Sequence, residues 1–157
     1  MYYNVGMGLF IKKGVVVSGF AGIGKSGLKE NVPYYKSLKT YDLSSSYFRK
    51  NLGWERIYCD IVESMRNEYD FVFISTHDVV IEEMKKRNID FYIVYPRKHC
   101  RDEYRERFIK RGNTREYVDK FMRSWDDFVD KLDNIDHEKK INLRSGQYLS
   151  DVLYRLR

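Results

Sequence analysis

Eight consecutive residues near the start of the chain have the types and the spacing that bind a chain of phosphates. They read Gly19-Phe20-Ala21-Gly22-Ile23-Gly24-Lys25-Ser26 and match the pattern G-x-x-x-x-G-K-[ST] in full. The glycines permit backbone angles that a β-carbon forbids, so that successive N–H groups can turn towards one anion. Lys25 places a cation on the β- and γ-phosphates, and the Ser26 hydroxyl is a natural ligand for Mg²⁺. The loop therefore predicts a site for the phosphates of ATP or GTP, with Mg²⁺.

The segments on both sides of this loop are those that such a site requires. Val15-Val16-Val17-Ser18 is a β-branched run and predicts a buried strand. Residues 25–31 predict a short helix that Pro33 ends. The amino end of that helix adds a positive partial charge beside the bound phosphates.

Predicted strands and helices alternate along the rest of the chain. Further strands are expected at residues 37–41, 71–74, 91–95 and 140–143. Helices are expected at residues 54–65, 78–87, 98–110, from 115 to about 132, and 149–156. This alternation predicts one α/β domain over residues 1–157, with a five-stranded parallel sheet covered by helices on both faces. Residues 1–14 are expected to lead into the first core strand and to add an edge strand. Ligands of such folds bind at the carboxyl ends of the strands.

Asp42 follows the second predicted strand and is expected close to the γ-phosphate. A carboxylate there can hold Mg²⁺ through water, or accept the proton of an attacking hydroxyl. The other interpretation is an Asx turn or helix cap in Asp42-Leu43-Ser44. The sequence leaves both open.

The third strand lacks the acidic residue that ends the corresponding strand of a motor-type ATPase. It ends instead in Ser75-Thr76-His77-Asp78. One of the two hydroxyls could bind a magnesium-linked water, and His77 could contact substrate. A helix-capping or partly buried imidazole is the simpler interpretation of His77.

Residues 97–115 are rich in arginine and are predicted to form a lid over the phosphates. Guanidinium groups bind phosphoryl oxygens bidentately, and phosphoryl transfer needs cations around the migrating group. Arg105, Arg107 and Arg111 are the candidates. The alternative is a solvated helix with many ion pairs, because Asp102, Glu103 and Glu106 partly neutralise it.

Two groups of aromatic residues have less specific interpretations. The stripe Phe121-Trp125-Phe128-Leu132 predicts core packing rather than a platform for a base. A nucleobase could stack on the aromatic residues between the loop and the second helix, which are equally well surface residues. These are Tyr34, Tyr35, Tyr47 and Phe48.

Composition fits one compact domain with an anionic ligand. The 157 residues are 43% hydrophobic and carry a formal net charge of +6. Two distant cysteines argue against a zinc site and a disulfide framework, so we expect a reducing cytoplasm. No apolar run approaches the length of a bilayer span, and no membrane partner is expected. The charge permits a nucleic-acid partner, but no recognised motif supports one.

Together, these residues resemble a known family. The loop, Asp42 at a strand end and the Arg-rich segment after the fourth strand resemble the nucleoside monophosphate kinase group, including adenylate kinase-like proteins. The small size and three runs are similar to short nucleotide kinase-like proteins encoded by bacteriophages. These runs are Tyr95-Pro96, Glu103-Tyr104-Arg105-Glu106-Arg107 and Arg111-Gly112-Asn113.

The resemblance covers the chain from Val15 onward and implies a three-layer P-loop NTPase fold with strand order 2-3-1-4-5. It also implies ATP and Mg²⁺ as cofactors, a nucleotide acceptor, and roles for Lys25 and Ser26. The chain departs from the family because it has no clear Arg-bearing acceptor motif before the second helix; Arg49 and Arg56 are the nearest substitutes.

Three functions follow as hypotheses. The first is a kinase that moves the γ-phosphoryl group of ATP to a nucleoside monophosphate, with Lys25 and the lid arginines stabilising charge. The second is a kinase acting on a hydroxyl of a nucleoside, a polynucleotide end or a small metabolite, with Asp42 as base. The third is a non-catalytic, nucleotide-binding regulatory protein.

Overall fold

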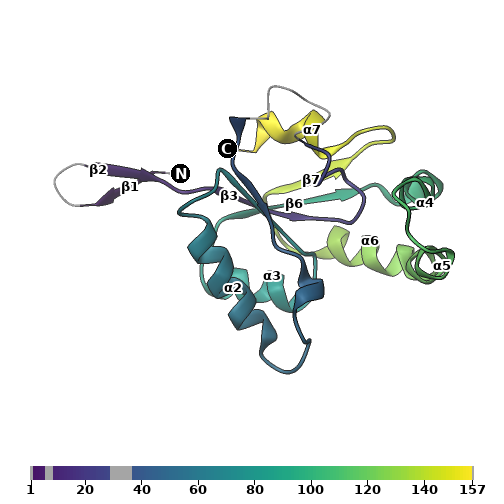
Figure 1. Ribbon diagram of the computed structural model, residues 1–157, viewed down its shortest axis with the longest axis horizontal. Coiled ribbons are helices and arrows are strands. Elements are labelled where there is room, and N and C mark those ends of the chain that lie inside the picture. The colour runs from purple at the N-terminus through teal and green to yellow at the C-terminus, as the bar shows by residue number, and fades with distance from the viewer. Residues whose placement is uncertain (1, 6–8, 29–36, 157) are drawn as a thin grey trace.

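Five parallel strands form the centre of the protein in a computed structural model, which describes residues 2–5, 9–28 and 37–156 (Figure 1). They are β3 (Val15–Gly19), β4 (Thr40–Asp42), β5 (Phe71–Ile74), β6 (Phe91–Pro96) and β7 (Lys140–Leu143). Their order across the sheet is β4-β5-β3-β6-β7, and each neighbouring pair is parallel. When β3 is numbered as strand 1 and β4 to β7 as strands 2 to 5, this is the predicted order 2-3-1-4-5.

Helices lie on both faces of the sheet, as expected. They are α2 (Trp54–Met65), α3 (Asp78–Lys86), α4 (Arg101–Lys110), α5 (Arg115–Arg123), α6 (Trp125–Asn134) and α7 (Leu149–Val152). Figure 1 shows α2, α3 and α6 on one side of the sheet and α7 on the other. It also shows α4 and α5 beside the end of the sheet at which the strands finish. Short 3₁₀ helices are η2 (Ser45–Tyr47), η3 (Lys98–Cys100) and η4 (Leu153–Arg155).

The central strands are buried on both faces, which is why their sequences are apolar without alternation. All four residues of β5 are buried, and β3 is buried from Val16 to Gly19. Both cysteines, Cys59 and Cys100, are buried free thiols. Within the described residues, no helix has the length and apolar character needed to cross a bilayer.

The amino-terminal segment differs from the expectation of an edge strand on the main sheet. β1 (Tyr2–Val5) and β2 (Leu9–Lys12) pair with each other as a separate antiparallel hairpin. Antiparallel pairing satisfies their facing backbone groups locally, and the edges of the main sheet are β4 and β7.

The single helix predicted from residue 115 to about 132 is wrong: the chain breaks at Ser124 into α5 and α6. Ser124 has φ −99° and ψ 4°, outside the helical region. The next side chain, Trp125, is fully buried and its indole N–H donates to the carbonyl of Lys98 at 2.8 Å. Both the burial of this ring and its hydrogen bond favour a break at this position.

Other local predictions have mixed outcomes. The Thr114 hydroxyl caps α5 by accepting from the N–H of Tyr117 at 3.2 Å, as predicted. The helical spacing of the apolar residues in 54–65 predicts that Ile57 lies on the buried face of α2, but it is 62% exposed. Residues 21–27 form turns and bends with helical geometry only at Leu28, and the rest of the predicted helix 25–31 lies outside the described residues. Tyr34 and Tyr35 lie outside them as well.

Candidate functional site

The carboxyl ends of β4 and β5 are joined by one buried tyrosine. The Tyr58 hydroxyl donates to the carbonyl of Leu43 at 2.6 Å and accepts from the N–H of Ser75 at 2.9 Å. Tyr58 is fully buried, and this burial is the main cause that raises the pKa of its phenol. This bridge fixes the turn that follows Asp42 against the end of the neighbouring strand.

Between β3 and residue 28, the chain turns its carbonyl groups into the protein. The Gly19 carbonyl accepts from Lys25 Nζ at 3.1 Å, that of Gly22 from Arg107 at 3.0 Å, and that of Ile23 from the N–H of Leu149 at 2.8 Å. In contrast, no backbone N–H of residues 21–26 donates a hydrogen bond to any residue that the structure describes. A loop with tied carbonyls and available amides is suited to an anion.

Two glycines of the loop are required by both backbone angle and space. Gly22 has φ +83° and Gly24 has φ +95°, in the left-handed region. A β-carbon on Gly22 would lie 3.0 Å from the Phe108 ring, and one on Gly24 would lie 3.0 Å from Tyr148. The loop therefore runs against aromatic side chains on two sides.

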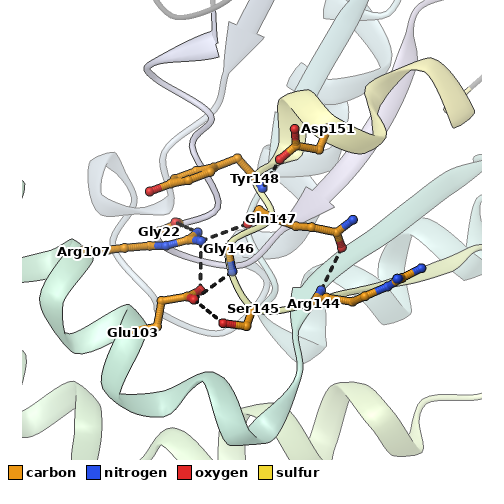
Figure 2. A network of polar contacts seen from close by, with 9 residues as sticks. All are labelled: Gly22, Glu103, Arg107, Arg144, Ser145, Gly146, Gln147, Tyr148 and Asp151. Carbon is orange, nitrogen blue, oxygen red and sulfur yellow. Dashed lines mark hydrogen bonds and ion pairs between the residues drawn. The ribbon is translucent and has the colours of Figure 1, made fainter.

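Arg107 is built into the wall of the loop (Figure 2). Besides Gly22, its guanidinium donates to the carbonyl of Gln147 at 2.9 Å and to the Glu103 carboxylate at 3.0 Å. It lies 4.4 Å from the ring centroid of Tyr104 and 3.8 Å from that of Tyr148. Only 10% of the side chain is exposed. Arg107 thus connects α4, the loop of residues 19–26 (the phosphate loop of the sequence prediction) and the segment between β7 and α7.

Glu103 completes this connection from α4, as Figure 2 shows. Its second carboxylate oxygen accepts from the Ser145 hydroxyl at 2.7 Å and from the N–H of Gly146 at 2.8 Å. Charge-assisted bonds of this kind are stronger than neutral ones. The segment 144–148 is therefore held against both α4 and the phosphate loop.

Burial and two charged side chains, Asp42 and Arg111, change the pKa of Lys25. Desolvation by burial lowers the pKa of its ammonium group; the Asp42 carboxylate opposes this, and the Arg111 guanidinium adds to it. A phosphate bound beside Lys25 would offset the cost of burying this cation. The three side chains therefore form one electrostatic group.

Two cavities open at this end of the sheet and meet at the loop. The first, of about 610 Å³, is lined by loop residues including Ser26, by the Arg107–Arg111 end of α4, and by Tyr148. The second, of about 690 Å³, lies towards the ends of β4 and β5 and towards α5 and α6. Ala21, Lys25 and Asp42 line both cavities. Lys25 and Asp42 are thus accessible from either side.

The structure brings most of the predicted site residues together, with one exception among the arginines. The first cavity includes Lys25, Ser26, Asp42, Arg107 and Arg111. Arg105 instead pairs with Asp119 of α5 at 3.1 Å, and it lines neither cavity.

The segment 97–115, predicted as a lid, is anchored in the core. Tyr104 and Phe108 are fully buried, and α4 presents Arg107, Lys110 and Arg111 to the first cavity. Arg49 and Arg56, the nearest substitutes for an acceptor motif, line neither cavity.

Sequence reasoning missed several residues of the site. Glu103 stands four residues before Arg107, a spacing that signals an ion pair on one helix face. Tyr148 had no signal, because its role depends on how the segment after β7 folds back. Phe121 and Phe128 were assigned to the core, yet both line the second cavity, and Phe128 is 40% exposed.

The donor set fits a magnesium ion that arrives with a nucleotide. Ser26 and Asp42 both line the first cavity and offer a hydroxyl and a carboxylate, the oxygen ligands that Mg²⁺ prefers. Within the described residues, no group of three His, Cys, Asp or Glu side chains could hold a metal alone. Phosphate oxygens would have to supply the remaining ligands.

Comparison with protein-family models and with curated proteins gave no match for this chain. The parallel sheet, its strand order and the loop after β3 are those of a P-loop-like α/β fold. Further assignment therefore depends on the geometry of the site.

The glycine geometry of the loop can be tested by adding one methyl group. Gly22→Ala and Gly112→Ala both place alanine at a positive φ, which costs about 1–2 kcal/mol. Only Gly22→Ala also displaces an aromatic ring, because nothing lies within 4 Å of the β-carbon position at Gly112. We expect Gly22→Ala to lower the free energy of unfolding by about 1–3 kcal/mol more than Gly112→Ala in urea denaturation. Equal losses would contradict the close packing of the loop.

The role of Arg107 is tested against that of Arg105. Arg107→Met removes the donor to one oxygen of the Glu103 carboxylate and to two carbonyls, and we expect the free energy of unfolding to fall by about 2–4 kcal/mol. Arg105→Met removes only a half-exposed ion pair and should cost below about 1 kcal/mol. Thermal and urea denaturation of both variants checks this. A similar small loss for both would refute the structural role of Arg107.

Proposed function

We propose that the protein is an ATP-dependent phosphotransferase, with the triphosphate donor in the first cavity and the acceptor in the second. The supporting observation is that two cavities of small-molecule size share Lys25 and Asp42. Such a junction is where a γ-phosphoryl group can pass from one substrate to another. A site that only hydrolysed nucleotide would need no second cavity there.

The loop residues bind and orient the donor. The amides of residues 21–26 face the phosphate oxygens, and Lys25 neutralises charge on the β- and γ-phosphates. Arg111 lies at the same cavity and adds a second cation, which the transferring group needs as its charge spreads. Catalysis by this arrangement consists of positioning and electrostatic stabilisation.

Ser26 and Asp42 would hold the magnesium ion together with the phosphates. Bound there, the ion supplies charge neutralisation between the β- and γ-phosphates. The chain's own contribution is to place a hydroxyl and a carboxylate in the same cavity as Lys25.

The geometry favours a hydroxyl acceptor. Asp42 lines the acceptor cavity as well as the donor cavity, so its carboxylate can accept the proton of an attacking hydroxyl. Both arginines of the site, Arg107 and Arg111, lie on the donor side. The monophosphate acceptor that the family resemblance implies stays a prediction.

Three substitutions test this function. Lys25→Met should abolish transfer of a labelled γ-phosphoryl group, since the migrating charge loses its main cation. Asp42→Asn should lower kcat by roughly 10²–10⁴-fold if the carboxylate is the base, with retained ATP binding. Asp127→Asn, an exposed aspartate on α6, is the matched control and should leave the rate unchanged.

The measurement is transfer from labelled ATP and Mg²⁺ to a panel of small hydroxyl compounds and of nucleoside monophosphates, with calorimetry for ATP binding. ATP binding without transfer to any member would indicate the regulatory, non-catalytic protein. Absence of triphosphate binding would reject the proposal altogether.

A further inference from the structure

The second cavity has an aromatic wall, formed by Tyr117, Phe121 and Phe128. Phe121 lies 6.0 Å from Tyr117 and 5.2 Å from Phe128 between ring centroids. Tyr117 and Phe128 remain 41% and 40% exposed although they belong to amphipathic helices with buried neighbours. Exposed rings that gather at a cavity beside a phosphate loop indicate a ligand with a flat apolar face.

A different part of the lining combines one more ring with hydrogen-bonding groups. Trp54, from α2, packs edge-to-face against the His77 ring, with 5.4 Å between the ring centroids. His77 Nδ1 lies 3.0 Å from the Ser75 hydroxyl, and Lys131 pairs with the Asp78 carboxylate. Donors and acceptors beside apolar rings suit a heteroaromatic base, which offers both a face and a polar edge.

The imidazole of His77 adds to this polar edge in its neutral form. Desolvation, then Lys50, lower its pKa, with a smaller contribution from Lys131; Asp78 acts in the opposite direction. Because Nδ1 contacts the Ser75 hydroxyl, the neutral ring presents Nε2 to a base, as a donor or an acceptor according to its tautomer.

The cations of this cavity are poorly placed for an acceptor phosphate. Its described lining contains three lysines and no arginine. Lys131 is paired with Asp78, and Lys50 donates to the Ser45 carbonyl at 2.8 Å and lies over the Trp54 ring. The third, Lys25, is the cation of the donor loop. A phosphate dianion usually requires convergent, bidentate cations, which here face the donor cavity.

From these observations we propose that the acceptor is a nucleoside: a heteroaromatic base held against the aromatic wall, with its sugar hydroxyl directed to Asp42. This inference depends on the proposed phosphotransferase function and narrows its acceptor. In the step, the hydroxyl oxygen forms a bond to the γ-phosphorus of ATP, and the bond from that phosphorus to the β,γ-bridging oxygen breaks. Asp42 takes the hydroxyl proton, and ADP and a nucleoside monophosphate leave.

The experiment measures product formation by chromatography from ATP and Mg²⁺, with the common ribo- and deoxynucleosides and their 5′-monophosphates as acceptors. We expect at least one nucleoside to react with a kcat/KM ten times or more that of its own monophosphate. Phe128→Ala should raise the KM for this nucleoside by about tenfold or more, the usual effect of losing a stacking ring, and leave the KM for ATP unchanged.

Tyr154→Ala is the matched control, because Tyr154 is 71% exposed in η4 and lines neither cavity. It should change neither KM. Nucleoside binding by calorimetry to Ser26→Ala should persist although transfer falls, because Ser26 lines the first cavity and not the second, which separates the acceptor site from the donor site.

The outcomes distinguish the two levels of the proposal. Preference for monophosphates, or equal KM effects of Phe128→Ala on ATP and nucleoside, would overturn the nucleoside acceptor while the phosphotransferase function remained. ATP binding with transfer only to non-aromatic hydroxyl compounds, or to no acceptor, would also overturn the nucleoside acceptor. Loss of ATP binding itself would instead reject the underlying function.

Discussion

The direction of the peptide groups between Gly19 and Ser26 is the constraint on which the rest of the site depends. Three carbonyls of this loop accept hydrogen bonds. Their donors are Lys25 of the loop itself, the Arg107 guanidinium and the backbone N–H of Leu149. With those oxygens fixed, the amides of residues 21–26 are left for an anion. Phe20 and Ile23 are almost wholly buried, and their side chains anchor the loop in the core. The conformation of the loop is therefore fixed by tertiary contacts, so that the phosphate site proposed here would be preorganised.

Helix α4 helps to hold this loop in place, a structural role that its many charged residues do not indicate. One guanidinium bonded to carbonyls on two separate segments, and flanked by two rings, cannot move without exposing the loop to rearrangement. The Arg111 guanidinium donates to Asn113 and lies over the Phe108 ring, and it makes no hydrogen bond to the loop among the described residues. Among the described residues, three basic side chains at this end of α4 line the first cavity, Arg107, Lys110 and Arg111, and of these Arg107 bonds to the loop.

The sequence predicted what local chemistry determines. The parallel sheet follows from the alternation of strands and helices, its order 2-3-1-4-5 was implied by the resemblance to the kinase group, and the position of Asp42 follows from its place at a strand end. The sequence did not distinguish Arg105 from Arg107, because α4 carries charges around its circumference and its inward face depends on the partners that Tyr104 and Phe108 find. The break at Ser124 and the exposure of Phe128 depend likewise on distant contacts, the first on the burial of Trp125.

The missing acid at the end of β5 is consistent with the division between the cavities. In P-loop NTPases an aspartate of this kind holds Mg²⁺ together with the loop Ser or Thr. The chain has Ser75 and Thr76 at that position and places its carboxylate on β4 instead, at the junction of the cavities. Asp42 lines both cavities, and the described lining of the second cavity contains aromatic side chains and no arginine. Under the proposed function, this arrangement would direct the phosphoryl group to an acceptor rather than to water.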